Sequence, residues 1–403
     1  MVSKGLLLPG VLLALAYGLK TVALPEAKQN TPSQRTSTAA EPRSANQSAS
    51  GVDDDRANGY SSRLSDLILP LPPMALPELL LPPYNFPSFD SERLDQELQL
   101  YLQYLRTHGK PDVLIIGSSR SLQGIDPAAL EEALATQGHP GLKVYNFGIN
   151  GATAQVMNLL MQDILAPEQL PRLVIWGDGS RAFNSGRPDR TYSQIVASPG
   201  YQRVQRGERP IPSRTTDWEI PTFVTTANKS LAESVAAANE TPVAPDLTLQ
   251  GFQTITEQYD PSSYYRRYPR VSGRYDNNYY NFNLRGDQTD ATVSLANFAR
   301  QQGITLVFVN LPLTRDYLAD TVRRNYETEF QQHMWRLAAR ERFMFRDLSQ
   351  HPELVKNHYF ADPSHINRHG ARAVAFQLAA DRTIPWHIVG SAPASRSNAN
   401  PSP

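Results

Sequence analysis

The chain of 403 residues contains no cysteine and has a formal net charge of zero, and each absence excludes classes of protein. Without cysteine there can be no disulfide, no thiolate nucleophile and no cysteine-ligated metal. Because 39 basic residues balance 39 acidic ones, no overall electrostatic field attracts nucleic acid. The eight histidines show no spacing typical of a metal site. We therefore expect no metal, no cofactor and no nucleic-acid partner.

The N-terminal segment is almost free of polar side chains. Lys4 precedes an apolar run from Gly5 to Leu19, and a second short run follows Lys20 and ends at Leu24. A positive start before such a run is typical of a secretory signal peptide, and the length also suits a membrane anchor of ~20 residues. Residues 1–24 are predicted to be one or the other, which would place the rest of the chain outside the cytoplasm, in the periplasm.

Two further stretches contain too few large apolar side chains to form a core. Residues 25–60 and 390–403 are of this kind, and we expect a disordered tether and a disordered tail. Residues 61–110 begin with an apolar stretch that proline interrupts every few residues, which predicts an extended strap followed by a lead-in helix. Residues 111–389 are predicted to form the globular domain.

That domain alternates between short apolar runs and segments of helical composition. Strands are predicted at residues 112–116, 142–145, 173–176, 304–310 and 344–348, and helices at 127–137, 153–165, 289–302, 318–342 and 368–381. Near-continuous apolar strands separated by helices predict a parallel sheet covered on both faces, in a doubly wound α/β fold of the flavodoxin type. Residues 186–285 interrupt the alternation and are predicted to be a large irregular insertion.

Small and polar residues gather where the predicted strands end. Gly117-Ser118-Ser119-Arg120 follows the first strand, Asn146 to Thr153 the second and Gly177-Asp178-Gly179 the third, while Asp362-Pro363-Ser364-His365 precedes the last helix. Ligands of a doubly wound sheet bind beyond the carboxyl ends of its strands. The sequence therefore predicts that these segments share one site.

These segments resemble the characteristic blocks of the SGNH, or GDSL-type, hydrolase superfamily, in the order found there. The chain most resembles its extracytoplasmic, membrane-tethered branches, which are related to alginate O-acetylation and teichoic-acid D-alanylation proteins. The resemblance implies a serine hydrolase with Ser119 as nucleophile, His365 as base and Asp362 as the residue that orients the imidazole. It also implies an oxyanion hole that includes the backbone N–H groups of Ser119 and Gly151.

The third block departs from the family pattern, which has Gly-x-Asn after the third strand. Here Asp178 follows Gly177, and Asn184 is the nearest asparagine that could supply a third oxyanion donor. Taken alone, the serine loop is also consistent with a tight turn and a helix cap, with Ser118 as an alternative nucleophile. Taken alone, His365 is also consistent with a structural histidine.

The insertion is rich in tyrosine. Seven of the 18 tyrosines lie between Tyr259 and Tyr280, interleaved with arginines. Aromatic faces suit sugar rings and guanidinium groups suit anions, so Tyr264, Tyr265 and Arg120 are candidates for substrate binding. The alternative is that the tyrosines only pack the insertion onto the sheet.

Three functions are consistent with these features. The first is a serine-dependent O-acyl esterase or acyltransferase that acts on an acylated glycan or other envelope polymer, with a membrane acyl-donor protein as a further partner. The second is a non-catalytic binding or scaffold module of an envelope assembly, favoured by the altered third block and the insertion. The third is a lipid-active esterase, for which the apolar strap is the only support. A short distance between Ser119 Oγ and the His365 imidazole would favour an enzyme.

Overall fold

The structure is a computed structural model that describes residues 84–212, 247–268 and 277–388. The predicted signal or anchor at 1–24, the tether at 25–60, the strap up to residue 83 and the tail at 390–403 lie outside the described residues. Among the residues described, no helix is long and apolar enough to cross a membrane.

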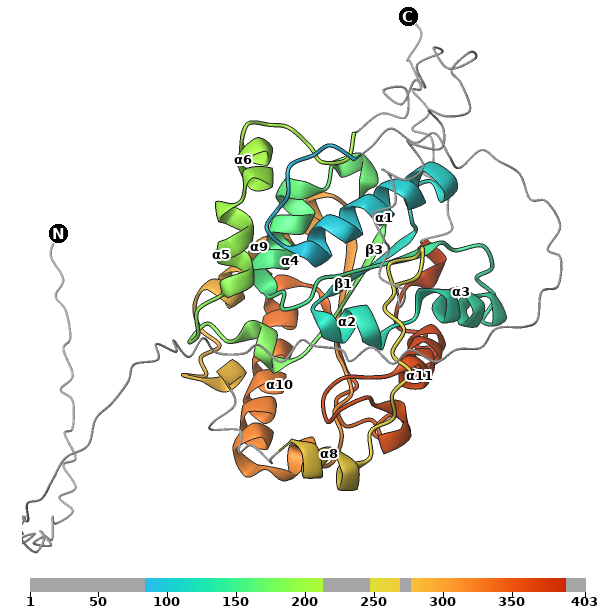
Figure 1. Cartoon of the computed structure of the whole chain (residues 1–403). Coiled ribbons are helices and arrows are strands. Elements are labelled where there is room, and N and C mark those ends of the chain that lie inside the picture. The colour runs from blue at the N-terminus through green and yellow to red at the C-terminus, as the bar shows by residue number, and fades with distance from the viewer. Residues whose placement is uncertain (1–83, 213–246, 269–276, 389–403) are drawn as a thin grey trace, which may run out of the picture. The chain divides into compact units, whose positions relative to one another are not determined.

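Five parallel strands form a sheet in the order β2-β1-β3-β4-β5 (Figure 1). The strands are β1 (Val113–Gly117), β2 (Val144–Gly148), β3 (Leu173–Asp178), β4 (Thr305–Asn310) and β5 (Met344–Asp347). This order and direction confirm the doubly wound, flavodoxin-type α/β fold expected from the sequence.

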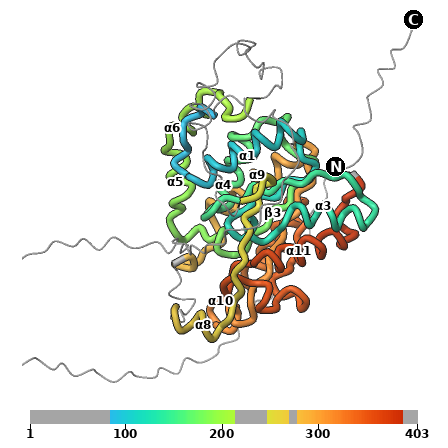
Figure 2. The backbone as a smooth tube through the Cα atoms, turned by 45° about the vertical axis from the view of Figure 1, so that its right-hand side comes forward, coloured from blue at the N-terminus to red at the C-terminus, as the bar shows by residue number. Residues whose placement is uncertain are grey.

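Helices cover both faces of the sheet. The α-helices of the described residues are α1 (Glu92–His108), α2 (Ser119–Gly124), α3 (Pro127–Thr136), α4 (Ala154–Leu159), α5 (Arg190–Ala197), α6 (Pro199–Gln205), α8 (Pro261–Arg267), α9 (Asp287–Gln301), α10 (Thr321–Glu341) and α11 (Arg368–Ala380). The core side chains of α1, α4, α9 and α10 join one buried cluster, and those of α3 and α11 join the other. Figure 2 shows α3 and α11 together, on the other side of the sheet from α4.

The strand β1 shows why both faces must be covered. Leu114 and Ile116 belong to the cluster on the α1 face, and Val113 and Ile115 to the cluster on the α3 face; all four are fully buried. Successive side chains of a strand point to opposite faces, so a strand that is apolar throughout needs helices on both sides. Burial of each such side chain stabilises the fold by roughly 1.5–3 kcal/mol.

Gly117, the last residue of β1, lies too close to β3 for any larger residue. A Cβ atom there would lie 2.1 Å from the carbonyl oxygen of Gly177, and its φ of +143° favours glycine. On the other side, Ile149 N–H donates to the Gly117 carbonyl over 2.9 Å. The end of β1 is thus fixed between β2 and β3, one position before the Ser118-Ser119 pair.

Most predicted strands and helices begin or end one to three residues away from their observed bounds, and β2 and α4 are two clear cases. The strand expected at 142–145 is β2, which begins at Val144 and extends to Gly148, so that Asn146 lies inside a buried strand. Its side-chain amide nitrogen donates to the carbonyl oxygens of Ser121 and Ile125, each over 2.9 Å, so both of its N–H groups are paired, whereas its buried Oδ1 has no partner among the described residues. The helix expected at 153–165 is α4 followed by a π-helical turn at Leu160–Ile164.

The described parts of the insertion contain the short helices α5, α6 and α8 and a segment at residues 247–259, which begins with a tight turn closed by a bridge between Leu247 and Gln253. This segment follows the edge strand β2, where Asn146 N–H donates to Gln250 O over 2.9 Å, and then reaches α2, where Gln253 N–H donates to Leu122 O. Farther along, Tyr259 N–H donates to the carbonyl of Phe360 over 2.7 Å. The segment therefore connects α2 with the loop that precedes α11.

Candidate active site

Ser119 is the first residue of α2 and lies directly beyond the end of β1. Ser118 caps this helix, because its hydroxyl oxygen accepts a hydrogen bond of 3.3 Å from the N–H of Arg120. The N–H groups of a first helical turn have no acceptor within the helix. The hydroxyl and the N–H of Ser119 thus both lie at the carboxyl edge of the sheet, where ligands of this fold bind.

The structure brings Ser119, His365 and Asp362 together. Ser119 Oγ lies 3.1 Å from His365 Nε2, although the two residues are 246 positions apart. On the other side of the ring, His365 Nδ1 lies 2.7 Å from Asp362 Oδ2. An ionised carboxylate can only accept, so Nδ1 carries the proton and the neutral ring presents the lone pair of Nε2 to the Ser119 hydroxyl. This is the tautomer that a general base for Ser119 requires.

The surroundings of Asp362 keep its carboxylate ionised. Burial by itself would raise the pKa of Asp362, but the positive charge that His365 carries when its ring is protonated, together with its hydrogen bond, holds that pKa well below its usual range. The backbone N–H groups of Ser364 and His365 contribute too, since both donate to Asp362 Oδ1, over 2.7 and 2.8 Å. A permanently charged acceptor orients the imidazole and would stabilise its protonated form.

A short hairpin holds Asp362 and His365 in place. Phe360 and Ile366 form an antiparallel bridge, and Ala361 N–H donates to the carbonyl of His365 over 2.9 Å. Because the acid and the base belong to one closed turn, their relative position depends on local backbone bonds and not on the packing of distant elements.

The buried Asn367 anchors this hairpin, and no functional role was assigned to it from the sequence. Its amide nitrogen lies 2.9–3.1 Å from the carbonyl oxygens of Glu257, His358 and Phe360. Its side-chain oxygen accepts from the N–H groups of residues 369 and 370 and so caps α11. An asparagine directly before a predicted helix is the sequence signal of such a cap.

Asp178, at the end of β3, binds the turn that carries Ser119. Its Oδ2 accepts from the N–H of Ser118 over 2.9 Å, and its Oδ1 accepts from the Ser118 hydroxyl over 3.0 Å and from Gly179 N–H over 2.9 Å. Burial raises the pKa of Asp178 to about 6, although the charge of Arg120 and these hydrogen bonds lower it. The Ser118 hydroxyl is thus engaged in the structure, which argues against Ser118 as the alternative nucleophile.

The prediction that Arg120 binds substrate is wrong for this structure. Its side chain is buried, and Nη2 donates to the carbonyl oxygens of Leu311 and Pro312 over 2.7 and 2.9 Å. A Cβ on Gly179 would lie 2.0 Å from Nη1, so the glycine leaves room for the guanidinium. Arg120 therefore ties α2 to the segment that follows β4, inside the protein.

The prediction that Asn184 is the third oxyanion donor is also wrong. Its amide nitrogen donates to the carbonyls of Asn278 and Tyr280, each over 3.0 Å, and its oxygen accepts from the N–H groups of Gly186 and Asn283. A side-chain amide has only two N–H donors, and both are used here. Asn184 instead holds the two ends of the insertion against each other.

Gly151, the other predicted oxyanion residue, follows β2 by three positions and has a φ of +70°. Within the described residues its N–H donates to no backbone acceptor. Thr191 packs against it, since a Cβ on Gly151 would lie 2.9 Å from the Thr191 hydroxyl oxygen. Its role as an oxyanion donor beside Ser119 stays a prediction.

Tyr264 and Tyr265 lie on α8 and are half-buried against the core cluster of α3 and α11, with their rings edge to face at 5.2 Å. This is the packing that the alternative interpretation expected. Burial, followed by the nearby negative charge of Asp362, raises the pKa of Tyr264 to about 12. Tyr264 thus lies near the Asp362 side of the site, and its contact with substrate stays a prediction.

Arg181, to which the sequence gave no role, lies beside the same hairpin. Its Nη2 donates to the hydroxyl of Ser364 over 3.2 Å. The Ser364 hydroxyl in turn lies 3.2 Å from Asp362 Oδ1 and 3.4 Å from His365 Nδ1. The Ser364 hydroxyl therefore links the Arg181 guanidinium group to both Asp362 and His365.

No protein-family model matches the chain, and no curated protein matches it. Among solved structures, a lipase/acylhydrolase from Enterococcus faecalis is 10% identical over 67% of this chain and 93% of that chain, with a TM-score of 0.33. An acetyl xylan esterase, AlAXEase, is 13% identical over 66% of this chain and 97% of that chain, with a TM-score of 0.31. Likenesses this low carry no weight for function, so an activity must be argued from the geometry of the site.

Proposed function

We propose that the protein is a serine-dependent O-acyl esterase or acyltransferase that works through an acyl-enzyme. The observation that carries this proposal is the 3.1 Å contact between Ser119 Oγ and His365 Nε2, with Asp362 2.7 Å from the other ring nitrogen. A serine hydroxyl becomes an effective nucleophile when a base is in place to take its proton, and His365 has the position and the tautomer for that task.

In the first half of the reaction, Ser119 Oγ attacks the carbonyl carbon of an ester while His365 Nε2 takes the hydroxyl proton. The carbonyl oxygen becomes negative and faces the N–H groups of Ser119 and Gly151, each of which lowers the barrier by about 3 kcal/mol. When this intermediate collapses, the bond to the alcohol oxygen breaks and His365 returns the proton to that oxygen. The products are a free hydroxyl and acylated Ser119.

In the second half, an acceptor hydroxyl attacks the acyl-Ser119 carbonyl carbon while His365 removes its proton. The bond to Ser119 Oγ then breaks, and Oγ regains the proton from His365. Water as the acceptor makes the protein an esterase, and a sugar hydroxyl makes it an acyltransferase.

We further propose that the substrate is an acylated glycan or another envelope polymer outside the cytoplasm. Tyr264 and Tyr265 of α8 are half-buried, Tyr264 lies near Asp362, and aromatic faces of this kind suit the stacking of a sugar ring. The apolar N-terminal segment, typical of a signal or anchor, supports the location. In the transferase case, a membrane protein would supply the acyl group.

A fluorophosphonate probe, which forms a covalent bond with activated serines, tests the nucleophile in the full chain. We expect labelling of the wild type and of Ser118→Ala, and none of Ser119→Ala. Labelling that persists in Ser119→Ala would refute the nucleophile. A folded wild type that takes no label would instead favour the non-catalytic binding module.

A second experiment separates hydrolysis from transfer. The protein is incubated with an acetylated oligosaccharide, with and without an excess of unacetylated oligosaccharide, and the products are separated by mass. Release of acetate in both samples indicates an esterase, whereas acetyl groups on the added oligosaccharide indicate a transferase.

A further inference from the structure

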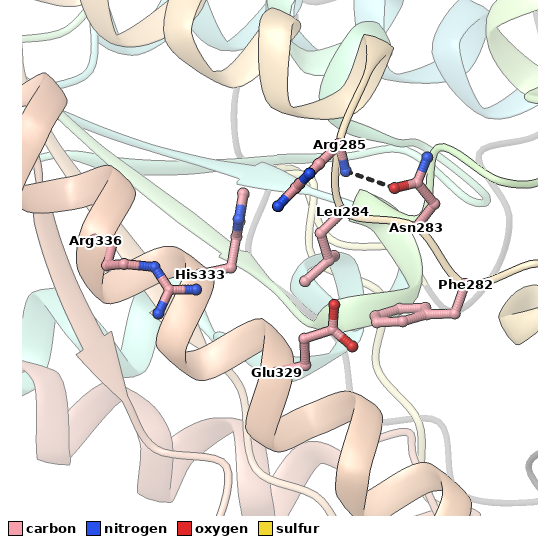
Figure 3. Close-up of a pocket in the computed structure, with 7 residues that line it drawn as sticks. All are labelled: Phe282, Asn283, Leu284, Arg285, Glu329, His333 and Arg336. Atoms are coloured by element: carbon pink, nitrogen blue, oxygen red, sulfur yellow. Dashed lines mark hydrogen bonds between the residues drawn. The ribbon is translucent and has the colours of Figure 1, made fainter. Parts of the chain in front are cut away.

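A pocket of about 370 Å³ lies between α10 and the segment that leads into α9 (Figure 3). Its lining residues are Phe282, Asn283, Leu284, Arg285, Glu329, His333 and Arg336. None of them belongs to the proposed triad, and the volume lies within the range of small-molecule sites. The pocket is therefore a candidate for a second binding site.

Basic side chains from two different elements meet in this pocket. His333 and Arg336 lie one turn apart on α10, and Figure 3 shows Arg285 reaching toward them from the segment before α9. Burial lowers the pKa of His333, and the charges of Arg336, Arg340 and Arg285 lower it further. Figure 3 shows His333 between the side chains of Arg336 and Arg285.

Within the described part of the chain, no ion pair with a carboxylate neutralises Arg285 or Arg336. Ion pairs of this kind are formed elsewhere, for example by Arg203, Arg340, Arg346 and Arg372. Glu329 also lines the pocket, but Figure 3 shows it on the Phe282 side, away from Arg336. The Arg336 end of the pocket therefore carries an excess of positive charge.

The hydrogen bonds of Thr289 determine the tautomer of His333. The Thr289 hydroxyl contacts the carbonyl oxygen of Leu284, to which it can only donate. It must therefore accept from Nε2–H of His333, which lies 3.0 Å away. The other ring nitrogen, Nδ1, is left as the atom that can gain a proton and become a donor.

We propose that this pocket binds the carboxylate or phosphate group of a small hydroxylated molecule, with Arg285 and Arg336 as its main ligands and His333 as a third once its Nδ1 has taken up a proton. Guanidinium groups present paired N–H donors that match these anions. Phe282 and Leu284 supply an apolar wall for the carbon skeleton, and Glu329 accepts a hydrogen bond from a ligand hydroxyl. The inference does not depend on the activity proposed for Ser119.

Isothermal titration calorimetry on the full chain tests the site, with inorganic phosphate and glucuronate as probes. We expect saturable binding of at least one probe by the wild type, and binding about tenfold weaker in Arg285→Gln and in Arg336→Gln. Preference for phosphate identifies a phosphate ester as the ligand class, and preference for glucuronate identifies a carboxylic acid. Both arginines are exposed, so both variants should fold.

Arg324→Gln is the matched control, because Arg324 is an exposed arginine on the same helix that contacts Thr321 and lies outside the pocket. It should bind the probes as the wild type does. The site would be refuted if neither probe binds the wild type saturably, or if Arg324→Gln loses as much affinity as the pocket variants.

Discussion

The carboxylate of Asp178 accepts hydrogen bonds from both the N–H and the hydroxyl of Ser118, the residue directly before the proposed nucleophile. The turn between β1 and α2 is therefore fixed from β3, the neighbouring strand of the sheet. In the SGNH pattern that the sequence resembles, this block contributes an asparagine. Here Gly179 stands where that pattern has the asparagine, and the residue before it is Asp178, whose carboxylate can only accept hydrogen bonds. The block therefore differs in chemistry as well as in sequence.

Asp178→Asn should slow the reaction without weakening substrate binding. An amide nitrogen cannot accept, so the variant loses at least one of the bonds that hold Ser118. A displacement of a reacting group by about 1 Å can reduce the rate about a hundredfold. We expect kcat on p-nitrophenyl acetate to fall about tenfold to a hundredfold, with KM nearly unchanged. An unchanged kcat would show that the Asp178–Ser118 contact does not position the nucleophile.

The same variant should change how stability depends on pH. Burial raises the pKa of Asp178 to about 6 from 3.8, so the folded protein binds this proton more tightly than the unfolded chain does. The contribution of Asp178 to the free energy of unfolding therefore rises as the pH falls through 6 toward 3.8. Relative to Asp178→Asn, the wild type should gain about 2 kcal/mol between pH 7 and pH 4. Urea unfolding of both proteins at the two pH values measures this difference.

Asp362→Asn should reduce kcat on p-nitrophenyl acetate by about a thousandfold to ten-thousandfold, with little change in KM. Without the carboxylate, His365 loses the acceptor that keeps the proton on Nδ1, and the ring no longer offers a lone pair to Ser119. Asp290→Asn, which changes an exposed acid on α9, is the control and should be fully active. A fully active Asp362→Asn protein would exclude the triad.

Asn367→Ala should lower the free energy of unfolding by about 2–4 kcal/mol, because it removes a helix cap and leaves buried carbonyl oxygens without donors. Asn367→Asp should have an intermediate effect, since a carboxylate can cap α11 but cannot donate to those carbonyls. Thermal and urea unfolding of the three proteins give the order. If the aspartate variant is as stable as the wild type, the carbonyl contacts contribute little.

Gly117→Ala should destabilise the protein by more than about 3 kcal/mol, because the new Cβ would lie 2.1 Å from the Gly177 carbonyl oxygen at a positive φ. Gly138→Ala is the matched control, since Gly138 also has a positive φ, +89°, but nothing lies within 4 Å of its Cβ position. It should cost only about 1–2 kcal/mol. Soluble yield and urea unfolding distinguish the two variants.

The sheet could be predicted because its signals are strong and local, whereas the meeting of Ser119 with His365 was expected from the resemblance of their segments to the SGNH blocks. Val113 to Ile116 is apolar at every position, which predicts a buried strand, and the small polar residues after it mark the edge where ligands bind. Parallel strands place all such ends at one edge, so distant segments meet whatever the details of packing.

The roles of Arg120 and Asn184 could not be predicted, because they depend on which way a side chain turns at a strand end. Arg120 turns inward because carbonyl oxygens beyond β4 offer acceptors and Gly179 leaves room. Asn184 finds partners in residues almost a hundred positions later, inside the insertion. The carbonyl partners of the Arg120 and Asn184 side chains lie far away in the sequence, so no local sequence pattern around either residue indicates them.

Residues 247–259 touch both the helix that begins with Ser119 and the hairpin that holds His365. This segment therefore connects the two parts of the proposed triad, the helix with Ser119 and the hairpin with Asp362 and His365. An engineer who wished to graft a new specificity onto this scaffold could not exchange it as an ordinary surface loop. Shortening it would disturb the backbone hydrogen bonds to Leu122 and Phe360, so any redesign of substrate preference should begin elsewhere in the insertion.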